Sequence, residues 1–341
     1  MNRRGDIETR EYATLDPRAA RSADSEGRMI PEEKCRFRTD FQRDRDRIIH
    51  SKSFRRLMHK TQVFLAPEED HYRTRLTHTL EVAQVSRTIA RILNYNEDLT
   101  EAIALGHDLG HTPFGHNGEG ILNDILKETE LSGFLHRVQS LRVVDVIEST
   151  PKRQGLNLTA EVRDGILNHS GPNLPKTLEG EIVRISDRIA YINHDIDDAI
   201  RSGVIAASDL PEEYLAVLGA SHSERINNLI ADLVTASENQ PHIQLSPDFQ
   251  EALDGLRDYM FANVYNSRTV LQAAADNHVD TVIREMFSYY MNHENEMPTL
   301  YRSIAEREGT IVGVKDYISG MTDRFALSKH AELFGEMAAN R

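Results

Sequence analysis

The chain of 341 residues carries a formal net charge of −14 and a single cysteine, Cys35. One cysteine excludes an internal disulfide and indicates a reducing compartment, while the acidic balance argues against polyanion binding over the whole surface. No stretch approaches the roughly 20 apolar residues that span a bilayer, and the residues before Arg36 contain no apolar core of signal-peptide length. The sequence therefore predicts a soluble cytoplasmic protein with no membrane partner.

The N-terminal part of the chain divides by composition at about residue 34. Residues 1–33 have few large apolar side chains and no periodicity, which predicts a flexible or loosely docked arm. From Lys34 to Lys60 there are ten Lys or Arg against three Asp, a local balance of +7. Such a segment suits a phosphate-rich ligand, although a solvated basic helix at a subunit contact is the commoner explanation for any one of these arginines. Residues 43–57 are predicted as helix, and 60–64 as a short extended piece.

Two consecutive helices are predicted next. Apolar residues recur at helical spacing over residues 72–93, with His78 near the start of the pattern. A second helical pattern covers residues 97–109. Because helices joined by a short turn pack side by side, we expect His78 to lie near His107 and Asp108.

Residues 104–119, ALGHDLGHTPFGHNGE, concentrate three histidines and two carboxylates. If the start of this stretch is helical, His107 and His111 lie one turn apart on one face, with Asp108 three residues before His111. Imidazole nitrogens and a carboxylate oxygen suit a divalent ion such as Mn, Fe, Ni, Co or Zn, or Mg with water completing its shell. The stretch therefore predicts part of a metal site.

A second pair in this stretch, His116 and Glu119, has a spacing of three. The pair indicates an imidazole oriented by its own carboxylate, which fits a general acid or base better than another metal ligand. A lone histidine near Gly and Pro is more often structural or merely exposed. The joint occurrence of these side chains on a turn of Gly, Pro and Phe favours the functional interpretation.

A long helix is predicted over residues 178–200, because isoleucines recur there at alternating spacings of four and three. Away from this apolar stripe, Asp187, Tyr191 and Asp195 follow one another every four residues. Such a line is usually a solvated face. A tyrosine between two aspartates also suits a sugar hydroxyl, with Asp187 free to act as a distant metal ligand.

Further helices are predicted over residues 119–147 with a break at Ser132-Gly133, and over 158–168, 211–234, 247–266, 268–294, 297–307 and 317–327, the last of which closes the chain. Strand signals are sparse and no repeat or linker separates the halves. The predicted fold is all-α: a single domain over residues 34–341, with a core at about 60–200 and a C-terminal helical extension over 201–341.

The order of the candidate residues resembles a known pattern. His78, His107-Asp108 and Asp187 follow the H…HD…D order of the HD superfamily of metal-dependent phosphohydrolases. The surrounding words KTQVF (60–64), TRLTHTLEV (74–82) and ISDRIAY (185–191) are similar to those of the deoxynucleoside triphosphate triphosphohydrolases, in particular the shorter bacterial proteins described as deoxyguanosine triphosphate triphosphohydrolase-like. The resemblance extends from about Asp40 through GMTDR at 320–324.

The resemblance implies a role for each matching residue. One divalent metal ion, Mg, Mn or another transition metal, is held by His78, His107, Asp108 and Asp187. His116, backed by Glu119, falls at the catalytic dyad, and His111 at a second active-site histidine that touches the phosphates. The implied substrate contacts are Gln62 for the 3′ hydroxyl, Tyr191 under the sugar, Asp195 as another sugar contact, Arg75 for phosphate, and Lys60 with the basic segment for the triphosphate. Arg137 replaces the Asn of the F-x-H-N-x-Q-S pattern, which leaves the role of His136 open.

The implied reaction is hydrolysis of a dNTP, dGTP or several dNTPs, at the α-phosphorus, which releases a deoxynucleoside and tripolyphosphate. The resemblance also implies a homo-oligomer, a tetramer or hexamer, with a dNTP effector at subunit contacts. One alternative is an HD phosphohydrolase of another nucleotide, such as a deoxynucleoside monophosphate or a guanosine alarmone. The other is a regulator that senses dNTPs or binds single-stranded nucleic acid through the basic segment.

Overall fold

The structure, a computed structural model, describes residues 3–62, 73–150, 153–265, 267, 270, 275 and 278–335. Within these residues the chain is helical, and β-structure is limited to isolated bridges such as that between Thr61 and Thr74. The all-α prediction is confirmed. Among the described helices, none is both long and apolar enough to cross a bilayer.

The α-helices follow one another along the chain with short connections. Their bounds are α1 Arg3–Thr14, α2 Asp40–Ile49, α3 Lys52–Arg56, α4 Arg75–Ile92, α5 Glu97–Gly106, α6 Gly115–Lys127, α7 His136–Arg142, α8 Ala160–Asn168, α9 Leu178–Arg201, α10 Glu212–Leu218, α11 His222–Ser237, α12 Pro247–Met260, α14 Val279–Asn292, α15 Thr299–Glu308, α16 Thr310–Ser319 and α17 Asp323–Phe334. Two π-helical turns, η3 Val143–Ile147 and η5 Phe261–Tyr265, extend α7 and α12.

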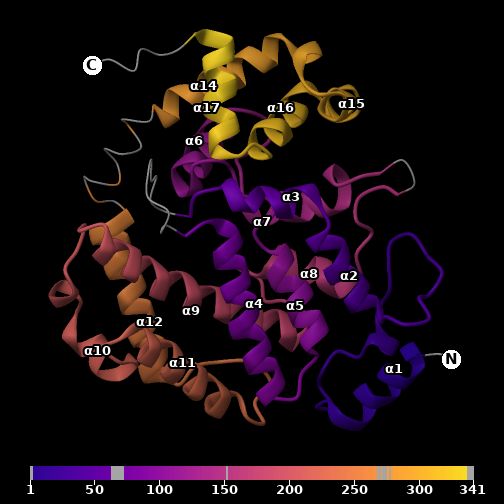
Figure 1. The fold of residues 1–341 in the computed structure, drawn as a ribbon, viewed down its shortest axis with the longest axis vertical. Coiled ribbons are helices and arrows are strands. Elements are labelled where there is room, and N and C mark those ends of the chain that lie inside the picture. The colour runs from indigo at the N-terminus through magenta and orange to yellow at the C-terminus, as the bar shows by residue number, and fades with distance from the viewer. Residues whose placement is uncertain are drawn as a thin grey trace.

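Helices α4 and α9 run through the centre of the molecule and contribute to two separate apolar cores (Figure 1). Val82 of α4 and Val183 of α9 lie in the larger core, which continues through α5 and α8 into α14–α17. The isoleucine stripe of α9 lies in the smaller core, against α11 and α12. The predicted extension therefore packs as two groups: α10–α12 beside α9, and α14–α17 at the far end of the molecule (Figure 1).

Three predicted helices are interrupted in the structure, each at a residue that caps the helix that follows. The predicted closing helix over 317–327 is wrong, because α16 ends at Ser319 and the Thr322 side chain accepts the backbone N–H of Phe325 to begin α17. Ser51 likewise separates α2 from α3, and Ser221 separates α10 from α11. A Ser or Thr hydroxyl that accepts a backbone N–H starts a new helix, and so divides a stretch that apolar spacing alone predicts as one helix.

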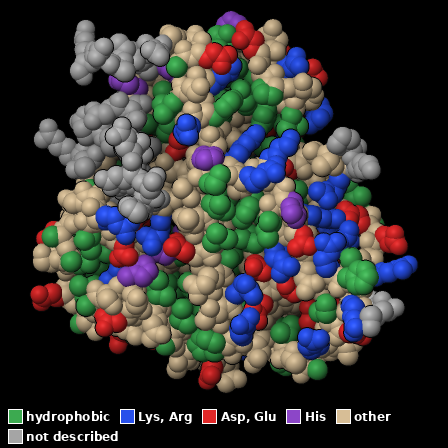
Figure 2. All heavy atoms as spheres, viewed as in Figure 1, with side chains coloured by type: hydrophobic (Ala, Val, Ile, Leu, Met, Phe, Trp, Pro, Cys, Tyr) green, Lys and Arg blue, Asp and Glu red, His purple; other side chains and the backbone are tan. Residues whose placement is uncertain are grey.

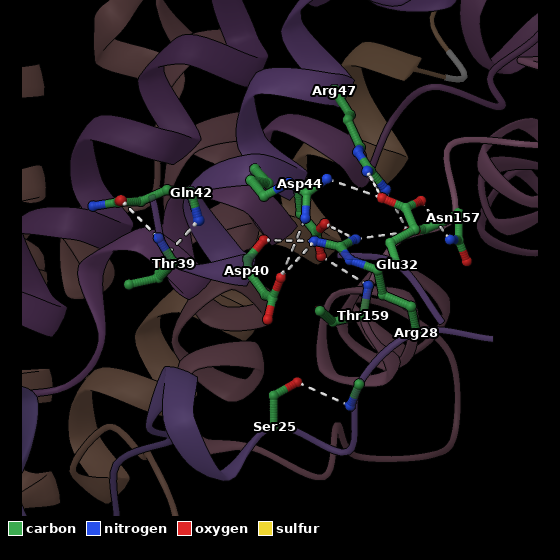
Figure 3. A network of polar contacts seen from close by, with 12 residues as sticks. Ser25, Arg28, Glu32, Thr39, Asp40, Gln42, Asp44, Arg47, Asn157 and Thr159 are labelled. Atoms are coloured by element: carbon green, nitrogen blue, oxygen red, sulfur yellow. Dashed lines mark hydrogen bonds and ion pairs between the residues drawn. The ribbon is translucent and has the colours of Figure 1, made fainter. Parts of the chain in front are cut away.

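The N-terminal segment differs from the expectation of a loosely docked arm. Residues 3–14 form α1, in which Arg4 is buried against Asp40. Further on, the guanidinium of Arg28 reaches the fully buried carboxylate of Asp44 and the backbone oxygen of Asn157 (Figure 3). The segment is held mainly by buried ion pairs and hydrogen bonds, with only small contributions from apolar side chains such as Leu15 and Ala19, so its sequence shows no apolar periodicity. The proposed boundary at residue 34 remains a prediction.

Candidate active site and metal centre

Three helices bring the four predicted metal ligands together. His78 lies in the first turn of α4, His107 and Asp108 follow the end of α5, and Asp187 lies in α9. His78 Nε2 is 3.1 Å from Asp187 Oδ1, and His107 Nε2 is 3.7 Å from the same oxygen and 3.4 Å from Asp108 Oδ1. We call these four residues the carboxylate cluster. The predicted approach of His78 to His107 and Asp108 is confirmed.

The residue types and their partners in the carboxylate cluster fit a divalent cation. The Nδ1 of His107 is hydrogen-bonded to the backbone oxygen of Ala104 at 2.6 Å, which leaves Nε2 buried and without a hydrogen-bond partner. This orphaned nitrogen faces Asp108 and Asp187, and a buried polar atom without a partner is costly unless a ligand satisfies it. Imidazole nitrogen and carboxylate oxygen form a donor set suited to first-row transition metals, and to Mg with added water.

The electrostatics of the cluster also favour a cation. Burial lowers the pKa of His107, but Asp108 and Asp187 more than offset it, so the pKa rises to about 9. Burial raises the pKa of the Asp187 carboxyl, but the neighbouring rings of His107 and His78 outweigh it and the pKa lies below its usual range. Two ionised carboxylates in a buried position attract a compact positive charge.

His111 reaches this cluster differently from the prediction. Residues 107–110 form a turn after α5 rather than the last turn of a helix, so His107 and His111 do not share a helix face. The turn nevertheless brings His111 Nε2 to 3.2 Å from Asp108 Oδ1. Gly110 permits it, because a Cβ there would lie 2.1 Å from the backbone nitrogen of Ser140 in α7. The close approach of α7 brings the ring of His136 onto that of His111.

His111, His136 and His169 form a second group, which we call the imidazole stack. The rings of His111 and His136 lie parallel, with an interplanar angle of 13° and centroids 4.1 Å apart. His136 Nε2 is 3.3 Å from His169 Nε2. Nitrogen lone pairs lie in the ring planes, so two parallel rings do not converge on one ion, although Asp108 is near both. The imidazole stack is therefore better suited to hydrogen bonding than to holding a second cation.

Glu119 serves the imidazole stack rather than His116. Its Oε1 accepts hydrogen bonds from the backbone nitrogen of His136 at 3.0 Å and from Nδ1 of the same residue at 2.9 Å, and its Oε2 lies 3.6 Å from His111 Nδ1. The predicted orientation of His116 by Glu119 is therefore wrong. The exposed ring of His116 lies 6.2 Å from that of His111, measured between centroids.

Two predicted substrate residues present unpartnered polar atoms at the site. Arg75 donates from one terminal nitrogen to Asp108 Oδ2 at 2.8 Å, while its Nε and other terminal nitrogen are buried without a partner. Gln62 is buried and its Oε1 has no partner. Atoms of this kind are expected where a polar ligand binds.

Of the other predicted substrate residues, two already have hydrogen-bond partners and the third is partly buried. Asp195 is buried and accepts a hydrogen bond from the hydroxyl of Tyr265 at 2.6 Å, and burial raises the pKa of its carboxyl to about 7. Tyr191 is partly buried on the same side of α9. The ammonium of Lys60 is buried and donates to the backbone oxygens of His111 and Ser319, so it is not free to bind phosphate in this arrangement.

Comparison with known proteins gives the family. The HD domain family matches residues 75–192, and the phosphohydrolase-associated domain matches residues 243–332. A deoxyguanosinetriphosphate triphosphohydrolase-like protein of Caldanaerobacter subterraneus subsp. tengcongensis is 55% identical over 324 residues, which cover 95% of this chain and 93% of that protein. A protein of the same description from Clostridium tetani is 48% identical over 338 residues, which cover 96% and 95%. The chain belongs to the deoxyguanosinetriphosphate triphosphohydrolase-like family. It is thus an HD-domain hydrolase with a metal-binding His/Asp cluster.

The residues that match the HD domain include the whole carboxylate cluster, from α4 to α9. Gln62 and Lys60 precede the match, and Asp195 follows it. Two residues of the site escaped the sequence interpretation. The only sequence signal for the imidazole stack is the F-x-H-x-x-Q-S motif around His136. His169 directly follows α8 and Tyr265 ends η5, and neither stands in a distinctive sequence pattern.

Proposed function

We propose that this protein hydrolyses deoxynucleoside triphosphates, dGTP or several dNTPs, to a deoxynucleoside and tripolyphosphate, with one divalent metal ion held by His78, His107, Asp108 and Asp187. The observation that carries the proposal is the carboxylate cluster, with its orphaned His107 Nε2, lying beside the unpartnered atoms of Arg75. The printed names of the relatives support the substrate class.

In the proposed reaction a water oxygen bonds to the α-phosphorus while the bond from that phosphorus to the 5′ oxygen breaks. A divalent cation supplies polarisation of the phosphate oxygens and activation of water. The free nitrogens of Arg75 hold phosphate oxygens by charge-assisted hydrogen bonds. The imidazole stack, fixed by Glu119, faces the same phosphates through His111. His116 acts either as the base that accepts the proton of the attacking water or as the acid that protonates the departing 5′ oxygen, and solvent supplies or takes up the other proton.

In this proposal, a second set of residues recognises the sugar. Gln62 Oε1 accepts a hydrogen bond from the 3′ hydroxyl, which would satisfy its missing partner. Asp195, paired with Tyr265, offers a second polar contact to the sugar. Tyr191 packs under C2′ and leaves no room for a ribose hydroxyl, which gives a steric preference for deoxy substrates.

The experiment that tests this function is a panel of the four dNTPs, alone and in pairs, with Mg or Mn, scored for tripolyphosphate by ion chromatography. We expect tripolyphosphate and deoxynucleoside in equal amounts, with little turnover of GTP. Release of inorganic phosphate from a deoxynucleoside monophosphate, or of pyrophosphate from a guanosine alarmone, would favour another HD phosphohydrolase reaction. Binding of dNTP without any product would favour a sensor.

The basic segment gives less support to triphosphate binding than its charge predicted. Most of its arginines are paired within the chain: Arg38 with Asp46, Arg43 with Glu32, Arg45 with Asp98 and Glu101, and Arg47 with Glu32. Figure 2 shows blue and red side chains intermingled on the right of this face, where α2 lies. Binding of single-stranded nucleic acid by this segment is therefore the weaker alternative.

A groove beside α3 offers a place for the dNTP effector that the family resemblance implies. It has a volume of about 640 Å³ and is lined by His50, Lys52, Arg55 and Arg56 together with Tyr301, Tyr317 and Phe325. Basic and aromatic side chains suit the phosphates and the base of a nucleotide. We propose that a dNTP effector binds here at a subunit contact of a tetramer or hexamer. Sedimentation of the protein with and without dNTPs, and dNTP-pair kinetics of Lys52→Ala, test this point.

A further inference from the structure

Asp323, the first residue of α17, turns its carboxylate toward the active site. Its Oδ2 accepts hydrogen bonds from the backbone nitrogen of Thr61 at 2.9 Å and from Thr61 Oγ1 at 2.5 Å. Its Oδ1 accepts from the backbone nitrogen of Phe114 at 2.9 Å. An acidic residue at a helix start normally interacts with its own helix dipole. Here both carboxylate oxygens instead join two segments that lie far away in the sequence.

The second of these segments holds residues of the proposed site in a demanding backbone conformation. Phe114 has φ 64° and ψ 27°, a left-handed conformation that is unfavourable for a residue with a side chain. The next residue, Gly115, has φ 57°, and a Cβ there would lie 2.6 Å from the backbone oxygen of Gln62. Such a backbone persists only where its surroundings fix it. It begins α6, which carries His116 and Glu119.

Lys60 makes a second tie between the same segments. Its buried ammonium donates to the backbone oxygen of His111 and to that of Ser319, at the end of α16, at 2.8 Å for the latter. Its own backbone oxygen accepts from the nitrogen of Arg75 at 3.0 Å. Together, Lys60 and Asp323 join the C-terminal helices to the chain on both sides of the active site.

We propose that Asp323 is a positioning residue, which through Thr61 and Phe114 holds Gln62 and the start of α6 in the geometry that the reaction requires. The C-terminal group α14–α17 is therefore part of the active-site scaffold. The GMTDR motif at 320–324 contributes to it through Asp323. The inference rests on the proposed function for its kinetic consequence. Its structural consequence, a fixed segment over residues 107–120, does not depend on the substrate.

The test uses the full-length protein with Asp323→Asn. An amide presents its NH2 group to either the Thr61 or the Phe114 backbone N–H, so one hydrogen bond is lost while the volume is kept. We expect faster hydrogen–deuterium exchange in peptides covering residues 107–120 and unchanged Mn²⁺ binding. We also expect kcat for dGTP to fall about 10- to 100-fold, because a misplacement of about 1 Å can cost a hundredfold in rate. Discrimination between dGTP and its 3′-deoxy analogue should fall as well, because Gln62 is displaced.

The matched control is Glu332→Gln, which removes the same charge from the exposed end of the same helix. Thr61→Val, which removes only the hydroxyl contact, gives a milder version of the effect if Asp323→Asn is poorly folded, and Thr61→Ser should restore wild-type behaviour. Faster exchange confined to residues 323–334, or wild-type kcat and discrimination in both Asp323→Asn and Thr61→Val, overturns the positioning role. A wild-type protein without triphosphohydrolase activity overturns the proposed function instead, and the exchange of residues 107–120 then decides the inference.

Discussion

The carboxylate cluster and the imidazole stack lie next to each other, yet they shift the pKa values of their histidines in opposite directions. In the cluster, two aspartates more than offset burial and raise the pKa of His107 to about 9. In the stack, burial and the charge of Arg75 keep the pKa of His111 well below its usual value, and burial with His107 and His136 lowers that of His169 to about 3. The cluster therefore favours positive charge, while His111 and His169 of the stack are held neutral. The neighbours of a histidine, rather than its position in a motif, decide what it can do.

The largest effect is expected from Asp108→Ala, because this residue serves both regions. It removes an oxygen from the cluster and the partner of Arg75, which would be left as a buried unpaired charge. We expect loss of metal, measured by plasma mass spectrometry, and loss of detectable tripolyphosphate formation. Asp280→Ala, at an exposed site on α14, is the control. Activity in a metal-stripped Asp108→Ala protein would refute the assignment of the carboxylate cluster.

Glu119→Gln should separate the two regions. The amide keeps one oxygen for His136 but loses the negative charge that faces His111 and His136. We expect the metal content to stay at the wild-type value while kcat falls about 10²- to 10³-fold, in the range for loss of general acid–base support. Steady-state kinetics together with metal analysis measures both. Loss of metal in this variant would mean that the two regions are one site.

The difference between the regions also explains how far sequence reasoning could reach. The carboxylate cluster could be predicted because His78 and Asp187 lie in helices with strong patterns and His107 and Asp108 directly follow a third. The isoleucine stripe of α9, for example, predicted the end of that helix within one residue. The partner of Glu119 could not be predicted. It depends on how the segment before α7 folds back onto α6, a contact between residues 119 and 136 without a periodic signature.

The same limit applies to the fold. Apolar periodicity predicted α4, α5 and α9 well, because each buries a continuous stripe. It missed the docking of residues 3–33, which relies on buried polar contacts such as that between Arg28 and Asp44. It also predicted one helix over 317–327, across the end of α16 and the start of α17, because a single capping hydroxyl at Thr322 is a weak signal. Polar contacts between residues far apart in the sequence leave no periodic pattern, so the sequence alone does not predict them.

His169→Phe should sharpen the comparison by removing the link between the regions. The ring of His169 lies between those of His107 and His136, with centroids 5.0 Å and 5.3 Å away. Phenylalanine keeps the ring but leaves His136 Nε2 without its partner. We expect kcat to fall about 10- to 100-fold with metal retained, as is usual when a supporting hydrogen bond to an active-site residue is removed. His293→Phe, at an exposed position, is the control, and a His169→Phe enzyme with full activity would show that the stack ends at His136.

The smallest effect is expected at Tyr191, which belongs to neither region and lies in line with Asp187 and Asp195 on α9. Tyr191→Ala opens space under the sugar without touching a charged group of the cluster, so turnover of dGTP should change little. The preference for dGTP over GTP, measured as the ratio of kcat/KM values, should fall about tenfold, since steric exclusion of one hydroxyl is worth only about 1–3 kcal/mol. Unchanged discrimination would assign the choice of sugar to other residues, with Gln62 and the Asp195–Tyr265 pair the next to test. A fall in metal content would instead show that Tyr191 supports Asp187, which lies one turn earlier on α9.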